Sequence, residues 1–290
     1  MRLRTLPLSL AGVLMGTFLA ASYTAVDWKV GLFLYLTAIL LQILSNLSNE
    51  LGDALHGTDN ADTREGMHYS IMDGTLTIQE MRRLIRWTAV AASVSGFIMI
   101  WLAFGSLSDV RSLVFLCLGA MALWAAMHYT LGDNPYGYRG LGDVAVFIFF
   151  GLATVLGGFY LCAGRICSWS ALLPASAIGF FSVGVLNVNN IRDMKSDAAT
   201  RRTVAIRLGE RGARIYQIVL IALGWSAMVA YSVIRPEISW IYIAVLPLYI
   251  VHLRGVWTRS GHDLDRMLPL LVISTFILSL LAGVGFAINQ

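Results

Sequence analysis

The stretch Asn46-Leu-Ser-Asn49-Glu50-Leu-Gly-Asp53-Ala-Leu-His56-Gly57-Thr-Asp59-Asn-Ala-Asp62 places a group of carboxylates at the end of a long apolar run. A membrane span does not carry such charge for packing reasons. If the segment is helical, Asn49 and Asp53 lie four residues apart on one face, so an amide oxygen and a carboxylate point into the same space. Hard oxygen ligands of this kind are typical of Mg²⁺ sites, where the ion also binds substrate phosphates.

A second polar stretch, Asn189-Asn190-Ile-Arg192-Asp193-Met-Lys195-Ser-Asp197, also closes an apolar run and repeats the Asn-x-x-x-Asp spacing. One copy of this pattern is weak evidence, because acidic residues at the ends of membrane helices are commonly solvated loop charges. Two copies at equivalent places favour one site shared by two similar halves of the chain. The sequence therefore predicts a single domain over residues 1–290, with two pseudo-repeated halves whose acidic motifs are residues 46–62 and 187–197.

The composition indicates a membrane protein. Hydrophobic residues make up 57% of the 290-residue chain and charged residues 13%, with a mean hydropathy of +0.70, whereas roughly a quarter of the residues in a soluble domain are charged. The net charge of +4 could suggest a nucleic-acid partner, but the basic residues lie between apolar runs without an interleaved aromatic platform. We therefore expect the lipid bilayer, and no nucleic acid, as a partner.

Runs of about 20 apolar residues predict an all-α, polytopic fold with nine transmembrane helices. Their approximate bounds are Leu6–Ala25, Val30–Ser48, Trp87–Phe104, Ser112–Thr130, Val144–Ala163, Trp169–Asn187, Tyr216–Ile234, Ile238–Val251 and Leu268–Ile288. The first run is interpreted as a retained span because no clear signal-peptide cleavage site follows it. Between the second and third runs, a Thr-x-x-Glu capping box at Thr77 and apolar helical spacing predict a short amphipathic helix over residues 77–85.

The distribution of basic residues predicts the orientation in the membrane. With nine spans, only four of the 21 Lys and Arg residues, namely Lys29, Arg111, Arg165 and Arg235, fall on one side. The positive-inside rule then places the amino terminus and both acidic motifs in the cytoplasm and the carboxyl terminus outside.

Cysteine and histidine residues give weaker signals. Cys117, Cys162 and Cys167 lie in or beside apolar runs, which predicts small buried side chains and neither a disulfide framework nor a thiolate metal site. His56 is expected beside a metal site rather than on the metal, because Mg²⁺ prefers oxygen. The other histidines singled out, His68, His252 and His262, are interpreted as loop residues.

Together the motifs resemble those of the UbiA-type intramembrane prenyltransferases. The resemblance rests on both acidic motifs and on the Arg-Thr-Val-Ala-x-Arg-Leu-Gly run over residues 202–209. Within the family, the opening Arg2-Leu-Arg4-Thr5-Leu6-Pro7-Leu8 and the run Tyr138-Arg-Gly140-Leu-Gly142-Asp143 before Phe147-Ile-Phe-Phe-Gly151 are most similar to the 1,4-dihydroxy-2-naphthoate prenyltransferase (MenA) branch. Glu50 stands where Asp is frequent in that family, and Asp143 stands where Glu is frequent, so both differences keep the charge.

The resemblance implies a UbiA-type bundle with a polar cavity at the cytoplasmic side of the inner membrane. It implies Mg²⁺-dependent transfer of a polyprenyl group from polyprenyl diphosphate to an aromatic acid, 1,4-dihydroxy-2-naphthoate. Carbon dioxide is lost, and the product is demethylmenaquinone in menaquinone biosynthesis. Alternatives are an acceptor of the 4-hydroxybenzoate or homogentisate type or, from another class, a secondary transporter, which also combines repeated halves with polar helix ends. The near absence of charge within the spans favours the enzyme.

The resemblance and the residue chemistry together assign roles to particular side chains. The expected Mg²⁺ ligands are Asn49, Asp53, Asp59, Asn189, Asp193 and Asp197. The expected diphosphate-binding residues are Asn46, Lys195, Arg201 and Arg202, and the expected acceptor-binding residues are Arg2, Arg4 and Arg139. Asp53, Asp193, Arg139 and Tyr138 are the expected catalytic residues; Tyr138 either stabilises a cation with its ring, holds the acceptor, or is a plain interfacial tyrosine. The glycine-rich loop that contains Tyr138 and Arg139 fits a ligand-binding loop and an ordinary connection equally well.

Overall fold

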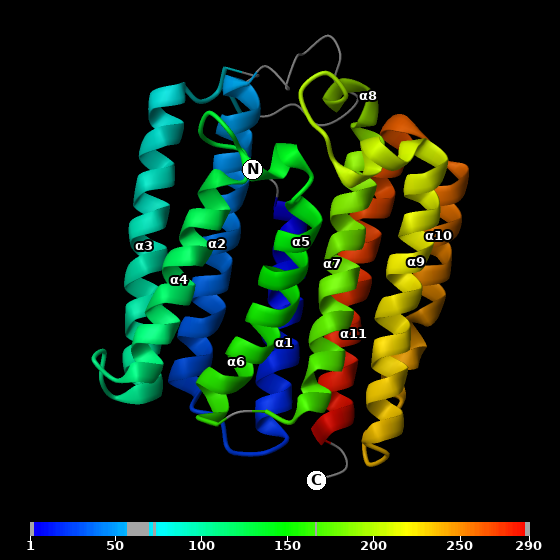
Figure 1. The fold of residues 1–290 in the computed structure, drawn as a ribbon. Coiled ribbons are helices and arrows are strands. Elements are labelled where there is room, and N and C mark those ends of the chain that lie inside the picture. Colours follow the sequence, from blue (N-terminus) through cyan, green and yellow to red (C-terminus); the bar gives the residue numbers. More distant parts are fainter. Residues whose placement is uncertain (1–2, 57–69, 72–73, 166, 288–290) are drawn as a thin grey trace.

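The computed structural model describes residues 3–56, 70–71, 74–165 and 167–287. These residues form helices and connecting turns, and no strand occurs among them (Figure 1). The prediction of an all-α fold is confirmed. Arg2, Asp59, Asp62 and His68 lie outside the described residues.

The helices run along a common axis and form a bundle (Figure 1). The α-helices are α1 (Leu6–Ala21), α2 (Trp28–Leu55), α3 (Ile78–Phe104), α4 (Val110–His128), α5 (Gly142–Val146), α6 (Thr154–Ala163), α7 (Leu172–Arg192), α8 (Met194–Asp197), α9 (Val204–Ile234), α10 (Leu246–Thr258) and α11 (Met267–Ala287). A π-helix, η3 (Phe147–Ala153), joins α5 to α6. Short 3₁₀ helices are η1 (Leu3–Thr5), η2 (Tyr136–Arg139), η4 (Trp169–Ala171), η5 (Ile241–Val245) and η6 (Gly261–Arg266).

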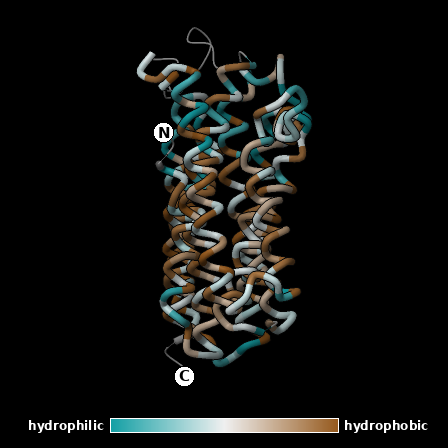
Figure 2. The backbone as a smooth tube through the Cα atoms, turned by 90° about the vertical axis from the view of Figure 1, so that its left-hand side faces the viewer, coloured by the Kyte–Doolittle hydropathy of each residue, from teal (hydrophilic) through white to brown (hydrophobic). Residues whose placement is uncertain are grey.

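Within the described part of the chain, eight helical segments are long and apolar enough to cross a membrane. They correspond to the second through ninth predicted spans. The first predicted span forms α1, which has 16 residues and is therefore shorter than the roughly 20 residues that usually cross the hydrocarbon core. Hydrophobic residues predominate along the length of the bundle, and hydrophilic residues gather at its ends (Figure 2).

The predicted amphipathic helix is the beginning of α3 rather than a separate element. Thr77 and Glu80 form the predicted capping box, in which the Thr77 amide donates to Glu80 Oε2 at 2.8 Å and the Glu80 amide donates to Thr77 Oγ1 at 3.2 Å. The helix then continues without interruption to Phe104. The cap is confirmed, and the polar first turns extend a membrane-spanning helix beyond its apolar part.

Helix α7 lies at the centre of the bundle and is buried along most of its length. It contacts η3 closely: a Cβ atom on Gly151 would lie 2.6 Å from the Cα atom of Gly179. Membrane helices approach in this way where small residues meet, because the close contact gains packing energy that apolar burial cannot supply in lipid. The π-helix is therefore held firmly against α7.

Two sequence-based assignments of side-chain environment are wrong. His252 was expected in a loop, but α10 continues past it and its ring is buried, with one nitrogen 3.0 Å from Gln217 Nε2 and the other 2.9 Å from the carbonyl oxygen of Met267. These polar partners on neighbouring elements make its burial possible. Cys117 was expected to be buried but is exposed on α4, because this helix presents most of its surface outward.

Candidate functional site

A polar face of α2 carries the first motif. Gln42, Asn46, Asn49 and Asp53 lie three or four residues apart on this helix, and all four line one cavity. The prediction that Asn49 and Asp53 share a helical face is confirmed. Sequence reasoning missed Gln42, although its spacing of four residues from Asn46 is the signal that could have identified it.

Asp53 is the centre of a buried ion-pair cluster. Its carboxylate is 2% exposed, accepts a hydrogen bond of 2.9 Å from the Tyr138 hydroxyl, and forms an ion pair with Arg201. The Arg201 guanidinium also lies 3.5 Å from Asp197 Oδ2, and its carbon lies 4.4 Å from the centroid of the Tyr138 ring. Three sequence segments that are far apart in the chain therefore meet at one guanidinium.

The charge of Arg201 is secured by these partners. Burial opposes the charged form, but the carboxylates of Asp53 and Asp197 outweigh it and raise the pKa of the Arg201 guanidinium above its usual value. Arg201 is therefore a fixed cation beside the first motif, at the end of the bundle where α8 lies (Figure 1).

Tyr138 lies in the structured part of the Gly- and Tyr-rich loop. Gly137 and Tyr138 are buried in η2, and the Tyr138 carbonyl accepts a hydrogen bond of 2.8 Å from the Arg202 amide. The His56 ring packs edge-on against the Tyr138 ring, with 5.3 Å between the ring centroids. The loop is thus part of the site, and Tyr138 directs its hydroxyl to Asp53 rather than to a membrane interface.

Arg192 organises the second motif. Helix α7 ends at Arg192, and Asp193 is its C-terminal capping residue, whose amide still bonds to the Asn189 carbonyl at 3.0 Å. Arg192 donates to Asp193 Oδ1 at 2.7 Å and to Asn189 Oδ1 at 2.9 Å. The chain turns at Asp193 into α8, so Asp193 lies just beyond the helix that carries Asn189.

Arg192 also connects the second motif to a distant loop. Its side chain is 2% exposed and donates to Asp265 of η6 at 2.5 Å. Asp265 accepts a second hydrogen bond, of 3.3 Å, from Arg4. The Asp265 carboxylate, in the segment before α11, thus joins the start of the described chain to the end of α7.

The predicted site residues fall into three groups. Those that line the cavity are Arg4, Asn46, Asn49, Asp53, Asn189 and Arg201. Tyr138 and Asp197 contact this group from outside the lining. Asp193 reaches it only through its backbone amide, which donates to the Asn189 carbonyl, while its carboxylate pairs with Arg192. Those with exposed side chains away from the lining are Arg139, Lys195 and Arg202. Arg2 and Asp59 lie outside the described residues.

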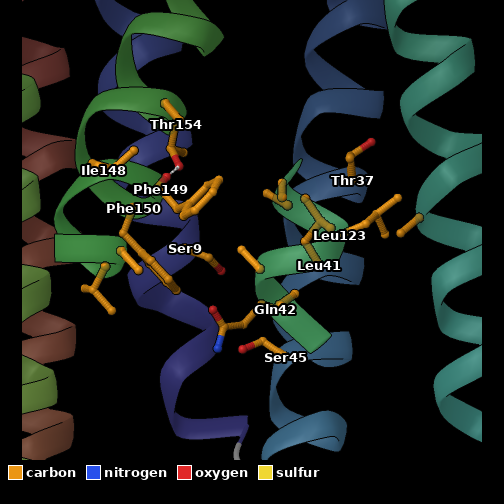
Figure 3. A pocket seen from close by; sticks show the side chains of 18 of the residues that line it. Ser9, Thr37, Leu41, Gln42, Ser45, Leu123, Ile148, Phe149, Phe150 and Thr154 are labelled. Atoms are coloured by element: carbon orange, nitrogen blue, oxygen red, sulfur yellow. Dashed lines mark hydrogen bonds between the residues drawn. The ribbon is translucent and has the colours of Figure 1, made fainter. Parts of the chain in front are cut away.

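The cavity has a volume of about 740 Å³, which is in the range of pockets that bury organic ligands. Its polar end contains Asn49, Asp53, Asn189 and Arg201. Its remaining walls are mainly apolar and come from α2, α3, α4, η3 and α6, as illustrated by Leu34, Phe97, Phe115, Leu118 and Leu161. Figure 3 shows part of this wall, where Leu41, Leu123, Ile148 and Phe149 face a common space. A ligand with a charged head and a long hydrocarbon tail matches this lining.

The polar end has the donor chemistry of a magnesium site. The carboxylate of Asp53 and the amide oxygens of Asn49 and Asn189 line this end and are hard ligands that come from both motifs. The Asp193 carboxylate follows outside the lining, at the end of α7. The described residues contain no group of three or more acidic, His or Cys side chains that could hold a metal by themselves. Mg²⁺ commonly needs only one or two carboxylates when substrate phosphates complete its shell, so the residues fit this ion.

Comparisons with known proteins agree with this geometry. The sequence profile of the UbiA prenyltransferase family matches residues 9–280. The chain belongs to this family. It is 36% identical to 1,4-dihydroxy-2-naphthoate octaprenyltransferase of Escherichia coli (strain K12), over 100% of this chain and 94% of that protein. It is 35% identical to the protein of the same name from Haemophilus influenzae, over 99% and 93% of the two chains.

The fold of this UbiA family member also matches a solved structure. An apo structure of a UbiA homologue from Aeropyrum pernix K1 superposes with a TM-score of 0.72 at 15% sequence identity, covering 100% of this chain and 99% of that chain. The UbiA-type helical bundle inferred from the motifs is therefore confirmed. The protein is accordingly a member of a membrane prenyltransferase family with several apolar helices.

Proposed function

We propose that this protein transfers a polyprenyl group from polyprenyl diphosphate to 1,4-dihydroxy-2-naphthoate, with loss of carbon dioxide, in menaquinone biosynthesis. The observation that carries the proposal is the single cavity, which joins the polar residues of both acidic motifs to a long apolar wall. The names of the bacterial relatives, which cover nearly the whole chain, support the identity of the acceptor.

The diphosphate binds at the polar end of the cavity. Arg201 is a charged side chain, 11% exposed, that lines it, and Asn46 lines it one helical turn from Asn49 and two turns from Asp53. Charge-assisted hydrogen bonds from a guanidinium to phosphate oxygens are strong, and they strengthen as negative charge grows on the leaving group. Lys195 and Arg202 are exposed, so they act by attracting the anionic substrate rather than by direct contact.

Asn49, Asp53, Asn189 and Asp193, with Asp59 and Asp197, would hold Mg²⁺ together with the diphosphate. When bound there, the ion neutralises the negative charge of the leaving diphosphate. The hydrogen bonds from Tyr138 to Asp53 and from Arg192 to Asp193 fix the orientation of these carboxylates. Groups that hold metal ligands in place in this way commonly affect affinity or activity by about 10–100-fold.

The transfer step breaks the bond between the first prenyl carbon and the diphosphate oxygen, and both electrons leave with the diphosphate. The ring carbon that bears the carboxylate bonds to the allylic cation. Carbon dioxide then leaves, and its bonding electrons return to the ring, which gives the prenylated quinol. The apolar walls from α2, α4 and α6 exclude water that would otherwise capture the cation.

Arg4 is the best placed of the three predicted acceptor-binding residues. It lines the cavity and is held there by Asp265, so it can pair with the acceptor carboxylate at a position separate from Arg201. The Arg139 side chain is exposed, and its carbonyl accepts a 3.0 Å hydrogen bond from Arg207. Arg139 therefore supports the loop around Tyr138 in this proposal.

Metal removal tests the proposal directly. Purified protein in nanodiscs is incubated with a polyprenyl diphosphate, Mg²⁺, and either 1,4-dihydroxy-2-naphthoate or 4-hydroxybenzoate. We expect prenylated product and released carbon dioxide with the naphthoate only, and loss of turnover in excess EDTA, restored by added Mg²⁺ or Mn²⁺. Full turnover in EDTA would contradict the metal site, and preference for 4-hydroxybenzoate would contradict the proposed acceptor.

A further inference from the structure

Gln42 carries an unpaired acceptor inside the cavity. Its side chain is 7% exposed, and its Nε2 atom donates to Thr5 Oγ1 at 3.1 Å and to Asn46 Oδ1 at 3.2 Å. Asn46 is oriented with its own Nδ2 donating to Thr5 Oγ1 at 3.3 Å, so Asn46 Oδ1 faces Gln42 as an acceptor. This contact assigns the nitrogen to this end of the Gln42 amide, whereas the Thr5 hydroxyl can accept from either amide or donate. The other end, Oε1, is buried and has no hydrogen-bond partner among the described residues.

This amide lies where a ligand can reach it. Gln42, Ser9 and Ser45 all line the cavity, and Figure 3 shows their side chains close together beside Phe149 and Phe150. The Ser9 hydroxyl already donates to the Leu6 carbonyl at 2.9 Å. A small polar subsite with aromatic rings next to it is therefore present in a wall that is otherwise mainly apolar.

A buried carbonyl oxygen without a partner is unfavourable, and a ligand that donates a hydrogen bond to it relieves this cost. Of the two substrates in the proposed function, on which this inference rests, only the aromatic acceptor carries donors, namely its ring hydroxyls. The prenyl chain has no donor, and the ionised diphosphate supplies acceptors. In 1,4-dihydroxy-2-naphthoate the 1-hydroxyl lies beside the carboxylate and donates to it, which leaves the 4-hydroxyl as the free donor. We infer that Gln42 Oε1 accepts a hydrogen bond from this 4-hydroxyl, so that Gln42 determines selectivity for a dihydroxylated ring.

The position of Gln42 agrees with this role. Gln42 precedes Asn49 by seven residues on α2, which corresponds to about 10 Å along the helix axis. This distance separates the hydroxyl contact from the diphosphate end and leaves room for the ring between them. Thr5, which Gln42 contacts, is adjacent in sequence to Arg4. A ring can therefore direct its carboxylate to Arg4 while a hydroxyl reaches Gln42.

Steady-state kinetics with paired acceptors test the inference. The acceptors are 1,4-dihydroxy-2-naphthoate and 1-hydroxy-2-naphthoate, which lacks one hydroxyl, and prenyl diphosphate is varied separately. In Gln42→Leu we expect kcat/KM for the dihydroxy acceptor to fall at least about tenfold, because sites that bind a hydroxyl discriminate against ligands that lack it. The value for the monohydroxy acceptor and the KM for prenyl diphosphate should change little, so the preference between the acceptors decreases.

Two controls separate this role from a structural one. Thr37→Val removes a different polar group from the cavity wall, a hydroxyl that already donates to the Phe33 carbonyl at 2.7 Å. This variant should leave the preference between the acceptors unchanged. Thr5→Val removes one of the two partners of Gln42 Nε2 but leaves Oε1 in place, and should retain most of the preference. Thermal unfolding in nanodiscs confirms that each variant is folded.

The outcomes distinguish the inference from the proposed function. An equal loss on both acceptors in folded Gln42→Leu would overturn it, as would a selective rise in the KM for prenyl diphosphate. If Gln42→Leu does not fold, Gln42→Met replaces it, because Met keeps the length of the side chain without the amide. Either of the same two results in folded Gln42→Met would overturn the inference. Failure of the wild-type protein to prenylate any naphthoate would instead refute the proposed function.

Discussion

At the scale of single residues, each acidic motif is paired with one arginine that is largely shielded from solvent. Arg201 contacts Asp53 of the first motif, and Arg192 contacts Asp193 of the second. Each arginine holds its carboxylate in a fixed position. Removing one member of a buried pair is costly because it leaves the other charge uncompensated.

Substitution of either aspartate should therefore abolish most activity while the protein still folds. We expect Asp53→Asn and Asp193→Asn each to lower kcat/KM at least about a hundredfold, the size of effect seen when a charge-stabilising group is lost from an active site. The amide keeps the shape of the side chain, and Arg201 retains its contact with Asp197.

The measurement is prenyl transfer by purified variants, with folding checked by thermal unfolding. Asp133→Asn is the matched control, because Asp133 is an exposed aspartate in the connection between α4 and η2, and it should behave like the wild type. Activity near the wild-type level in a folded Asp53→Asn or Asp193→Asn variant would show that the motif does not form the site.

The sequence was sufficient to identify site residues that are marked by a short, regular spacing in the chain. Asn49 and Asp53 are four residues apart, so helical geometry alone placed them together. Asp265 was missed because its contact with Arg192 depends on tertiary structure. Asp265 lies 73 residues from Arg192 in the chain, and no pattern in its own loop marks it as a neighbour of the second motif.

At the scale of elements, α9 contains a break that positions the basic segment. Gly209 has φ 70° and ψ 170° inside α9, where the helical backbone is interrupted. This region of backbone space is essentially restricted to glycine. Because of this break, the turn from Thr203 to Leu208 points in a different direction from the membrane part of α9. This turn directly follows the loop from which Arg201 contacts Asp53.

A side chain at Gly209 should strain this turn. We expect Gly209→Ala to destabilise the protein by about 1–3 kcal/mol and to raise the KM for prenyl diphosphate, because Arg201 shifts with the turn. Thermal unfolding and kinetics in nanodiscs measure the two effects. Gly31→Ala is the control, since Gly31 lies in the first turns of α2 with no atom within 4 Å of an added Cβ, and it should be neutral or slightly stabilising. Equal melting temperatures for the two variants would contradict the argument.

Helix positions were predictable where composition and caps agree, as at the start of α3. The π-helix at Phe147–Ala153 and the break at Gly209 were not, because an apolar run has the same composition whether its turns are regular or widened. The equivalence of the two halves, with motifs 46–62 and 187–197, remains a prediction. The polar residues of α2 and α7 at the same end of the cavity are consistent with it.

At the scale of the whole molecule, the two ends of the described chain lie at opposite ends of the bundle (Figure 1). Arg4 contacts Asp265 beside the second motif, whereas the carbonyl of Gly285 near the end of α11 accepts a 3.3 Å hydrogen bond from Ser239, beyond the far end of α9. An even number of crossings would bring the chain back to its starting side. Since the described residues contain eight helices of full spanning length, we infer that the shorter α1 also crosses.

This inference, with the basic residues concentrated at the site end, predicts a cytoplasmic amino terminus and an external carboxyl terminus. In a variant with Cys117, Cys162 and Cys167 replaced by Ala, single cysteines are introduced at the exposed positions Ser108, between α3 and α4, and Ser260, before η6. A membrane-impermeant maleimide added to intact cells should label Ser108→Cys, and should label Ser260→Cys only after permeabilisation. A phosphatase reporter fused after the last residue should be active outside the cytoplasm. The reverse labelling pattern would mean that the site lies on the side of the membrane where soluble prenyl diphosphates are absent. The expected labelling together with a cytoplasmic carboxyl terminus would mean that α11, which follows Ser260, does not cross the membrane.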